Sequence, residues 1–215
     1  GSSLNVIPEL MSSHDNSTEA FTSIPDLSKY SNIAIGPGLG TRQQTAKALK
    51  ILLQEVQNPM VFDADALNIL SENKTWLSFI PAQSILTPHL KEFERLVGKS
   101  KNTFERIEKA KAFTKKYSLY LILKGAHTMV FTPTSKVYFN STGNPGMATG
   151  GSGDVLIGVI AALISQNYSS LEASLLGVFL HGFAGDLAAE RLGFESLIAS
   201  DIIENLGSAF KSLYR

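Results

Sequence analysis

A glycine-rich stretch with one acidic residue is the part of this chain best suited to chemistry. Residues 144–154 read Asn-Pro-Gly-Met-Ala-Thr-Gly-Gly-Ser-Gly-Asp, and the apolar run 155–164 follows at once. Glycines let the backbone turn tightly and approach a ligand closely. The apolar run has the length of a helix and apolar residues on every side. We therefore expect a buried helix whose first turn presents unpaired N–H groups to the loop.

Those N–H groups and the helix dipole favour an anion, and phosphate suits such a loop best. A carboxylate beside a phosphate repels it, so the presence of Asp154 here indicates a functional role. We interpret Asp154 as a base, because a phosphate cradle beside a base suits phosphoryl transfer to a hydroxyl. The alternative is a glycine turn without a ligand, in which Asp154 is a favourable charge at a helix start. The density of glycines and the apolar helix behind them favour the first interpretation.

The composition is that of a globular protein with balanced charge. The 215 residues are 44% apolar and 18% charged, and Lys plus Arg equals Asp plus Glu at 19 each. We expect one domain over residues 1–215, with neither nucleic acid nor a membrane as partner. There is no cysteine for a disulfide or a thiolate metal site, and the four histidines lack metal-ligand spacing. No apolar stretch is expected to be long and unbroken enough to span a bilayer, so the predicted compartment is cytoplasmic.

The hydrophobic pattern predicts strands that alternate with helices. Strands are expected near 6–11 and at 32–35, 60–63, 84–86 and 119–123, and helices from Thr41 to before Pro59 and at 66–70, 89–97 and 103–117. A hairpin of 128–132 and 136–140 precedes the glycine loop, and helices at 155–164, 171–191 and 199–213 complete the chain. This order predicts an α/β fold with helices on both faces of a mostly parallel sheet and an antiparallel hairpin near the C-terminal end.

Ligands of such sheets bind outside the carboxyl ends of the strands. The segments that follow the predicted strands are therefore expected to face one crevice. They are 36–40, 63–68, 87–92 and 124–128, joined by the glycine loop at 146–154.

The first of these segments, Gly36-Pro37-Gly38-Leu39-Gly40, is a strand-to-helix turn. Its N–H groups could contact a phosphate or a carbonyl. Pro37 interrupts the dinucleotide-binding pattern, and a tight turn without a ligand explains the segment equally well.

The second segment contains Asp63 and Asp65. Side chains two apart in an extended chain share a face, so these carboxylates could bracket one cation or hydroxyl, and Mg²⁺ prefers such ligands. Alternatively, Asp65 caps the short helix that follows. We keep Asp65 and Asn68 as residues that line the site and hold Asp63 more loosely.

His89 and Lys124 complete the candidates. His89 follows Pro88 at a helix entry, as a donor or stacking partner for the ligand or as a histidine that faces solvent. Lys124 ends the most apolar strand and could supply charge to a nucleotide phosphate, whereas a solvated loop lysine is the alternative. His181 and Asp186 lie within a long helix and are expected to be structural, with His181 hydrogen-bonded at the helix surface.

Together and in this order, the motifs resemble the NAD(P)H-hydrate dehydratase family of the ribokinase-like superfamily. The matching segments are 35–40, 63–68, 86–93, 123–128 and 144–154, so the resemblance runs from about residue 30 to the C-terminal end. It implies a ribokinase-like three-layer α/β/α sandwich. Members usually begin with a further strand–helix–strand unit that carries part of the substrate pocket. Residues 1–30 do not match it, so we expect this unit, and the epimerase domain fused to some members, to be absent from the sequence.

The resemblance implies dehydration of the S form of hydrated NADH or NADPH. ADP in most prokaryotic members, or ATP in eukaryotic ones, phosphorylates the added hydroxyl, and phosphate is then eliminated. It further implies Mg²⁺ with the nucleotide, a homotetramer, and Asp154 as the catalytic base. The expected substrate contacts are Gly38, Gly40, Asp65, Asn68, His89 and Asp154. The expected nucleotide contacts are Lys124, Gly125, Ala126, His127, Thr128, Asn144, Thr149, Gly150, Gly151, Ser152 and Gly153.

Two other functions remain open from the sequence. A small-molecule kinase of the same superfamily would use Asp154 and the same loop on a vitamin precursor or sugar, and would release a stable phosphate ester. A non-catalytic nucleotide-binding module would bind nucleotide without turnover.

Overall fold

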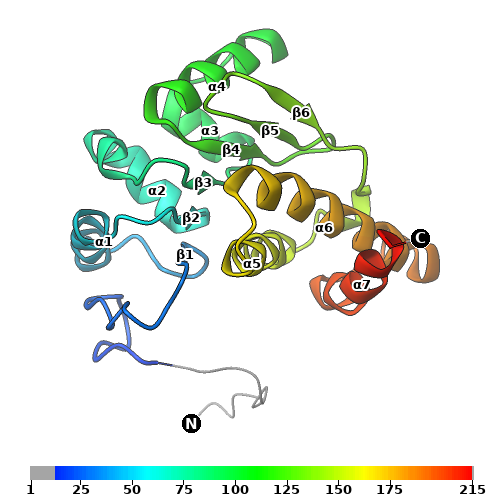
Figure 1. The fold of residues 1–215 in the computed structure, drawn as a ribbon, viewed down its shortest axis with the longest axis horizontal. Helices are drawn as coiled ribbons and strands as arrows, with labels where there is room; N and C mark the ends of the chain where they lie inside the picture. The colour runs from blue at the N-terminus through cyan, green and yellow to red at the C-terminus, as the bar shows by residue number, and fades with distance from the viewer. Residues whose placement is uncertain (1–12, 215) are drawn as a thin grey trace.

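The computed structural model describes residues 13–214, and the strand expected near 6–11 lies outside them. Within this range the chain forms a six-stranded sheet whose strands follow their order along the chain (Figure 1). The strands are β1 (Ala34–Ile35), β2 (Val61–Phe62), β3 (Ile85–Leu86), β4 (Tyr120–Leu123), β5 (Met129–Phe131) and β6 (Val137–Phe139). Neighbours from β1 to β4 are parallel, whereas β5 and β6 pair antiparallel. The predicted sheet and hairpin are confirmed.

Helices cover both faces of the sheet (Figure 1). One layer contains α1 (Gln43–Glu55), α2 (Ala64–Glu72), the 3-10 helix η1 (Lys74–Phe79), α3 (Leu90–Val97) and α4 (Thr103–Tyr117). The other contains α5 (Ser152–Ser165), α6 (Ser170–Leu192) and α7 (Ala199–Ser212), and the short 3-10 helix η2 (Pro145–Met147) lies in the loop before α5. The predicted three-layer arrangement is therefore confirmed.

The two cores follow from the alternation of side chains along each strand. Phe62 and Leu86 point into the core beneath α1–α4, whereas their neighbours Val61 and Ile85 point into the core beneath α5 and α6. All four side chains are fully buried. Complete burial of one such side chain contributes roughly 1.5–3 kcal/mol, so both faces hold the strands in place.

Helix α6 differs from expectation in one respect. By length and composition it is apolar enough to cross a membrane, so the expectation that no stretch has this character is wrong. Yet α6 packs against α5, α7 and β4. Burial between these elements accounts for its composition, as in the core helix of a globular fold.

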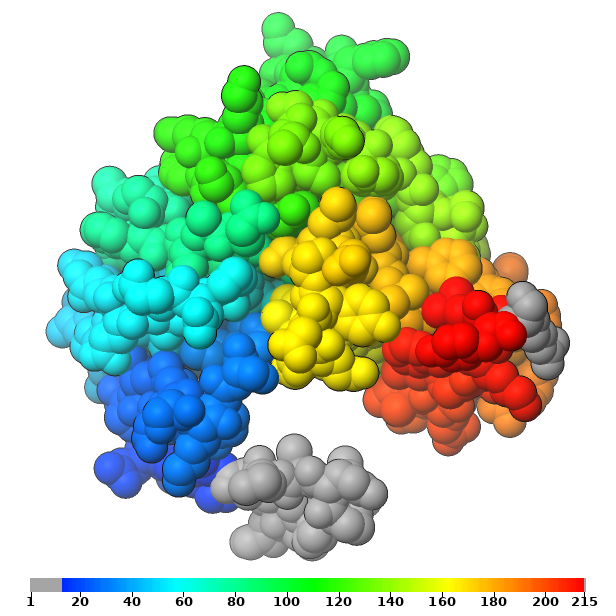
Figure 2. Space-filling model, in the orientation of Figure 1, coloured from blue at the N-terminus to red at the C-terminus, as the bar shows by residue number. Residues whose placement is uncertain are grey.

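Helix α5 is less buried than its sequence predicts. Asp154, Gly158 and Ala162 are spaced by four residues and form an exposed stripe. Beside this stripe, α5 and α7 enclose a groove of about 580 Å³ that is lined mainly by apolar side chains. Figure 2 shows the surface indented between α5, in yellow, and α7, in red. Because glycine and alanine count as apolar, the sequence did not distinguish this exposed face from a buried one.

The sheet topology sets the position of the candidate site. The parallel strands β1–β4 all end at one edge of the sheet, and an isolated parallel bridge joins His89 to Lys124 just beyond it. Strand β5 runs away from this edge and β6 returns to it, because Phe139 pairs with Met129. The loop that leads to α5 therefore starts at the same edge.

Candidate functional site

The first turn of α5 is an uncapped helix start. Gly151 is the N-cap residue, with φ of 85°, and no side chain caps the turn. Ser152 N–H has a long hydrogen bond of 3.4 Å to Thr149 O. Within residues 13–214, no acceptor is found for the N–H groups of Gly150, Gly151, Gly153 and Asp154. Free N–H groups at the positive end of a helix dipole form an anion site, and the exposed Asp154 lies in the same turn.

A partly buried ion pair lies against this turn. The Lys124 ammonium donates a hydrogen bond of 2.7 Å to Asp63 Oδ1, and the Asp63 side chain is only 2% exposed. A Cβ atom at Gly153 would lie 3.3 Å from Lys124 Nζ. The ammonium is thus held beside the backbone of the anion-binding turn, where it adds positive charge. It is not the solvated loop lysine considered as the alternative.

The predicted pairing of Asp63 and Asp65 around one cation or hydroxyl is wrong. The chain turns at Ala64, with φ of 46°, so the two side chains leave the extended geometry that would align them. Asp63 is the N-cap residue of α2 and pairs with Lys124, whereas Asp65 Oδ2 accepts a hydrogen bond of 2.8 Å from Gly40 N–H. The alternative of Asp65 as helix cap is also wrong.

Asp65 instead joins two of the predicted motifs. Besides Gly40 N–H, its carboxylate accepts a hydrogen bond of 3.3 Å from the Asn68 side chain. Asn68 Oδ1 in turn accepts one of 2.6 Å from Arg95. The Asp65 carboxylate therefore holds the Gly36–Gly40 turn against α2, and the Asn68 side chain holds that carboxylate in place.

His89 is the N-cap residue of α3 in a reciprocal capping box with Glu92. His89 Nδ1 accepts from Glu92 N–H at 3.2 Å, and Glu92 Oε2 accepts from His89 N–H at 2.8 Å. Because Nδ1 is the acceptor, the neutral ring carries its proton on Nε2. The His89 side chain remains 48% exposed. Sequence reasoning did not identify this capping box, because histidine is an uncommon cap residue.

His181 is not at a helix surface as expected; it is buried against the glycine loop. Its Nε2 lies 2.9 Å from Ser152 O and 3.4 Å from Ser152 Oγ. Burial, with a smaller contribution from the nearby Lys124 charge, lowers the pKa of His181 from 6.5 to about 4, although the hydrogen bond to Ser152 O opposes the shift. The ring is therefore neutral near pH 7, and Nε2–H donates to the Ser152 carbonyl.

The remaining predicted nucleotide contacts lie in two loops. Gly125, Ala126 and His127 are exposed after β4, and Thr128 Oγ1 donates to Gly125 O at 3.2 Å to close their turn. Asn144 caps η2 by accepting from Gly146 N–H at 3.1 Å. Four residues organise the site: Asp63, Glu92, His181 and Asp186. Sequence reasoning held Asp63 loosely, expected His181 and Asp186 to be structural, and gave Glu92 no role. The hydrogen-bond and ion-pair partners of Asp63, His181 and Asp186 lie in other elements, and Glu92 acts in a capping box with an uncommon cap residue, so local sequence patterns do not reveal these roles.

Comparison with known proteins identifies the family of the chain. Residues 2–207 match the NAD(P)H-hydrate dehydratase family. The chain belongs to this family. It is 42% identical over 193 residues to the bifunctional NAD(P)H-hydrate repair enzyme Nnr of Thermofilum pendens, covering 88% of this chain and 37% of that protein. It is 37% identical over 174 residues to the ADP-dependent (S)-NAD(P)H-hydrate dehydratase of Neisseria meningitidis, covering 78% and 59%.

Solved structures of this family and superfamily have the same fold. The Bacillus subtilis ADP/ATP-dependent NAD(P)H-hydrate dehydratase, co-crystallized with ATP/Mg²⁺, has a TM-score of 0.73 at 29% identity, covering 85% of this chain and 65% of that one. A ribokinase-like superfamily protein of Enterococcus faecalis has a TM-score of 0.70 at 27% identity, covering 84% and 63%. The predicted ribokinase-like fold is confirmed. The chain spans little more than a third of the first curated relatives that it matches.

Proposed function

We propose that the chain dehydrates the S form of hydrated NADH or NADPH, with ADP or ATP as phosphoryl donor. The observation that carries this proposal is the uncapped first turn of α5, where free N–H groups lie beside the exposed Asp154. Such a turn suits a phosphate and a base at once. The names of the family and of the Neisseria meningitidis relative supply the substrate class.

In the proposed reaction, the oxygen of the added hydroxyl attacks the terminal phosphorus of the nucleotide. Asp154 accepts the proton of that hydroxyl during the attack. The bond from that phosphorus to the leaving nucleotide breaks, and the N–H groups of 150–153 hold the transferred phosphoryl group. The ring nitrogen lone pair then expels phosphate by breaking the carbon–oxygen bond. Loss of a proton from the adjacent ring carbon restores the double bond.

The remaining residues divide between the two ligands. The hydrated nicotinamide is assigned to the edge formed by Gly38, Gly40 and His89, with Asp65 and Asn68 behind the glycine turn. The nucleotide is assigned to the loops 124–128 and 144–153. Lys124 is suited to the phosphates because Asp63 holds its ammonium beside Gly153.

Mg²⁺ would accompany the nucleotide and neutralise part of its phosphate charge. Within residues 13–214 no cluster of three or more His, Asp or Glu side chains is suited to a metal. This composition fits an ion held chiefly by phosphate and water, which is common for Mg²⁺, with Asp154 as the exposed carboxylate nearest the loop. We further propose a cytoplasmic homotetramer, with neither nucleic acid nor a membrane as partner.

The substitution Asp154→Asn tests the proposal. We expect it to lower the rate of NADH recovery at least a hundredfold, because a general base contributes about 10²–10⁴ in rate. The dissociation constant for ADP should change less than threefold, since the backbone donors remain. Recovery is followed by absorbance of the reduced nicotinamide, and ADP binding by calorimetry.

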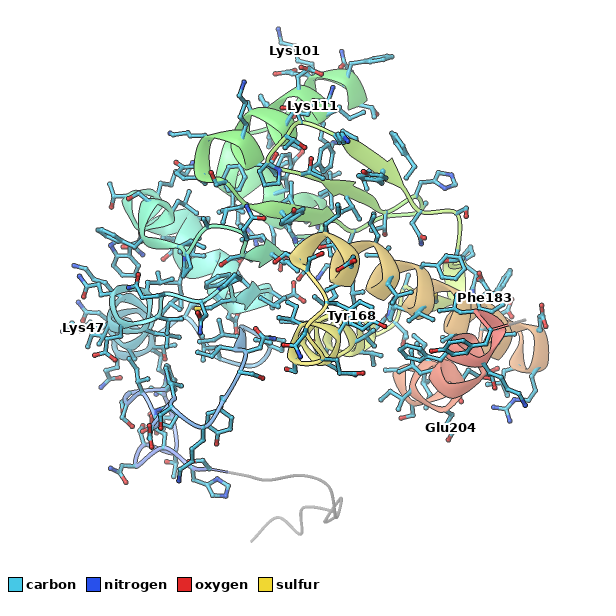
Figure 3. All side chains as sticks on the ribbon, in the orientation of Figure 1. Lys47, Lys101, Lys111, Tyr168, Phe183 and Glu204 are labelled. Carbon is cyan, nitrogen blue, oxygen red and sulfur yellow. The ribbon has the colours of Figure 1, made fainter. Side chains whose placement is uncertain are left out.

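A matched control is Glu204→Gln, which removes one carboxylate from the outer side of α7 (Figure 3). It should leave both measurements unchanged. A wild-type chain that binds nucleotide and releases a stable phosphate ester would show a kinase instead. Loss of ADP binding in Asp154→Asn with turnover intact would contradict the assigned roles.

A further inference from the structure

The loop that forms the proposed nucleotide site rests on one short segment of α6, residues 181–186, which reads His-Gly-Phe-Ala-Gly-Asp. Four of these six residues contact the loop between Thr142 and Ser152. They do so with two polar side chains and two glycines, as set out below. The function proposed above leaves His181, Gly182, Gly185 and Asp186 without a role.

The two polar side chains hold the two ends of the loop. Asp186 Oδ2 accepts a hydrogen bond of 2.8 Å from Gly143 N–H, and Asp186 Oδ1 accepts one of 2.9 Å from the Asn144 side chain. At the other end, His181 Nε2 lies 2.9 Å from Ser152 O. Residues five apart on one helix thus hold both the entry to the loop and its exit into α5.

The two glycines bring the loop against the helix. A Cβ atom at Gly182 would lie 2.3 Å from Thr142 Oγ1 and 2.8 Å from the Thr142 carbonyl carbon. One at Gly185 would lie 2.2 Å from Met147 Sδ. Real Cβ atoms do not approach other atoms so closely. A side chain at Gly182 would therefore displace the backbone of Thr142, whereas one at Gly185 would require the flexible Met147 side chain to move.

We propose that residues 181–186 are a template that shapes the nucleotide loop before any ligand arrives, and that Asp186 is its main positioning residue. Asp186 touches neither ligand in this proposal; it acts through Gly143 and Asn144. Its carboxylate is needed for geometry at a place where its negative charge disfavours an anion. The inference rests on the proposed function insofar as the loop binds nucleotide.

That conflict of charge and geometry provides a sharp test. Asp186→Asn keeps the size of the side chain but removes one acceptor and one negative charge. If the carboxylate acted only through its charge, its loss would tighten ADP binding. If it positions the loop, ADP should bind at least tenfold more weakly, because one of the two N–H groups loses its acceptor. Glu190→Gln, one turn further along α6 and exposed, removes the same charge without touching the loop and serves as the control.

The measurements are ADP affinity by calorimetry and amide hydrogen exchange of the ligand-free 215-residue chain. We expect Asp186→Asn to speed amide exchange at least tenfold at Gly143 and Gly146 and to leave exchange in β2–β4 unchanged. Glu190→Gln should exchange at the same rates as the wild type. Three results would each overturn the inference. They are unchanged exchange in the loop, faster exchange across the whole sheet, and ADP binding that is unchanged or tighter.

A second variant covers the case in which Asp186→Asn does not fold. Gly182→Ala adds one methyl group to α6, where alanine is a better helix former than glycine by about 1 kcal/mol. The helix itself should persist while Thr142 is displaced, so ADP affinity should again fall at least tenfold. Unchanged affinity would overturn the template. If the wild-type chain does not bind ADP at all, the proposed function fails, and the exchange measurement alone decides whether α6 shapes the loop.

Discussion

The site depends on side chains that act on one another more than on any single reactive group. Asp154 is exposed and free to meet a ligand, whereas Asp63, Glu92, His181 and Asp186 each serve a neighbour. Such partnerships fix the direction of N–H groups and charges before substrate arrives. Preorganisation of this kind is the usual source of electrostatic stabilisation in enzymes.

The histidine in this set makes stability depend on pH. The pKa of His181 is about 4 in the folded chain and 6.5 when exposed, so the unfolded chain binds a proton that the folded chain rejects in this range. The free energy of unfolding should therefore fall by about 3 kcal/mol from this group as pH drops from 6.5 to 4, with no contribution above that range.

The measurement is urea unfolding at several pH values for the wild type and for His181→Gln, whose amide retains a donor for Ser152 O. The difference in stability between the two should vary with pH only between about 4 and 6.5. A constant difference across this range would show that His181 does not titrate as a buried neutral ring.

The sequence predicted candidate residues for the site more readily than it predicted the contacts that hold them. Asp154 and the glycines stand together in eleven residues, so a local pattern was enough to propose them as candidates. Asp186 and Gly143 are separated by 43 residues, and His181 and Ser152 by 29. No local spacing encodes such a contact, because it depends on how α6 packs against the loop.

At the scale of elements, the close approach of β1 and β2 decides how the glycine turn is placed. Gly36 has φ of 140°, and a Cβ atom there would lie 1.8 Å from Asp63 O. Gly38 has φ of 64° but open space around it. We therefore expect the two glycines to differ strongly in their tolerance of a side chain.

Gly36→Ala should lower the free energy of unfolding by more than about 4 kcal/mol, because the strand ends must separate. Gly38→Ala should cost only about 1–2 kcal/mol, the strain of a left-handed alanine. Chemical denaturation of both variants tests this. Similar losses for the two would mean that backbone strain, and not the contact with β2, explains the glycine at position 36.

The elements themselves were largely predictable, because each short strand ends at a glycine, proline or polar residue and each helix has apolar residues three and four apart. The direction in which side chains point at the strand ends was harder to predict. The prediction that the Asp63 and Asp65 side chains share a face was wrong. Ala64 has a positive φ and α2 begins there, one residue after Asp63, so the chain is no longer extended. A tight turn at a single residue leaves no composition signal in its neighbours.

At the scale of the whole molecule, a bound nucleotide should stabilise the fold. The loops assigned to the nucleotide follow β4 and β6, and the second of them leads into α5, so the ligand would join the edge of the sheet to the helical layer that contains α5. At a concentration a hundred times the dissociation constant, ADP should add about 2.7 kcal/mol. For a chain of this size that raises Tm by roughly 5–10 °C.

Thermal unfolding with increasing ADP measures this, and Asp154→Asn should show the same rise because it keeps the backbone donors. A Tm that does not depend on ADP concentration would count against the nucleotide site. A rise in the wild type that disappears in Asp154→Asn would move the aspartate from catalysis to nucleotide binding.

The antiparallel hairpin has a practical consequence. Because β5 runs away from the edge where β4 ends, the reversal at Pro133–Ser135 lies at the far edge of the sheet, and only β6 leads back. A fluorophore, affinity tag or surface tether attached at this reversal would report on or immobilise the protein while leaving the opposite rim clear. Deleting one residue within β6, in contrast, would move the strand residues after the deletion to the opposite face of the sheet and shorten the connection to α5.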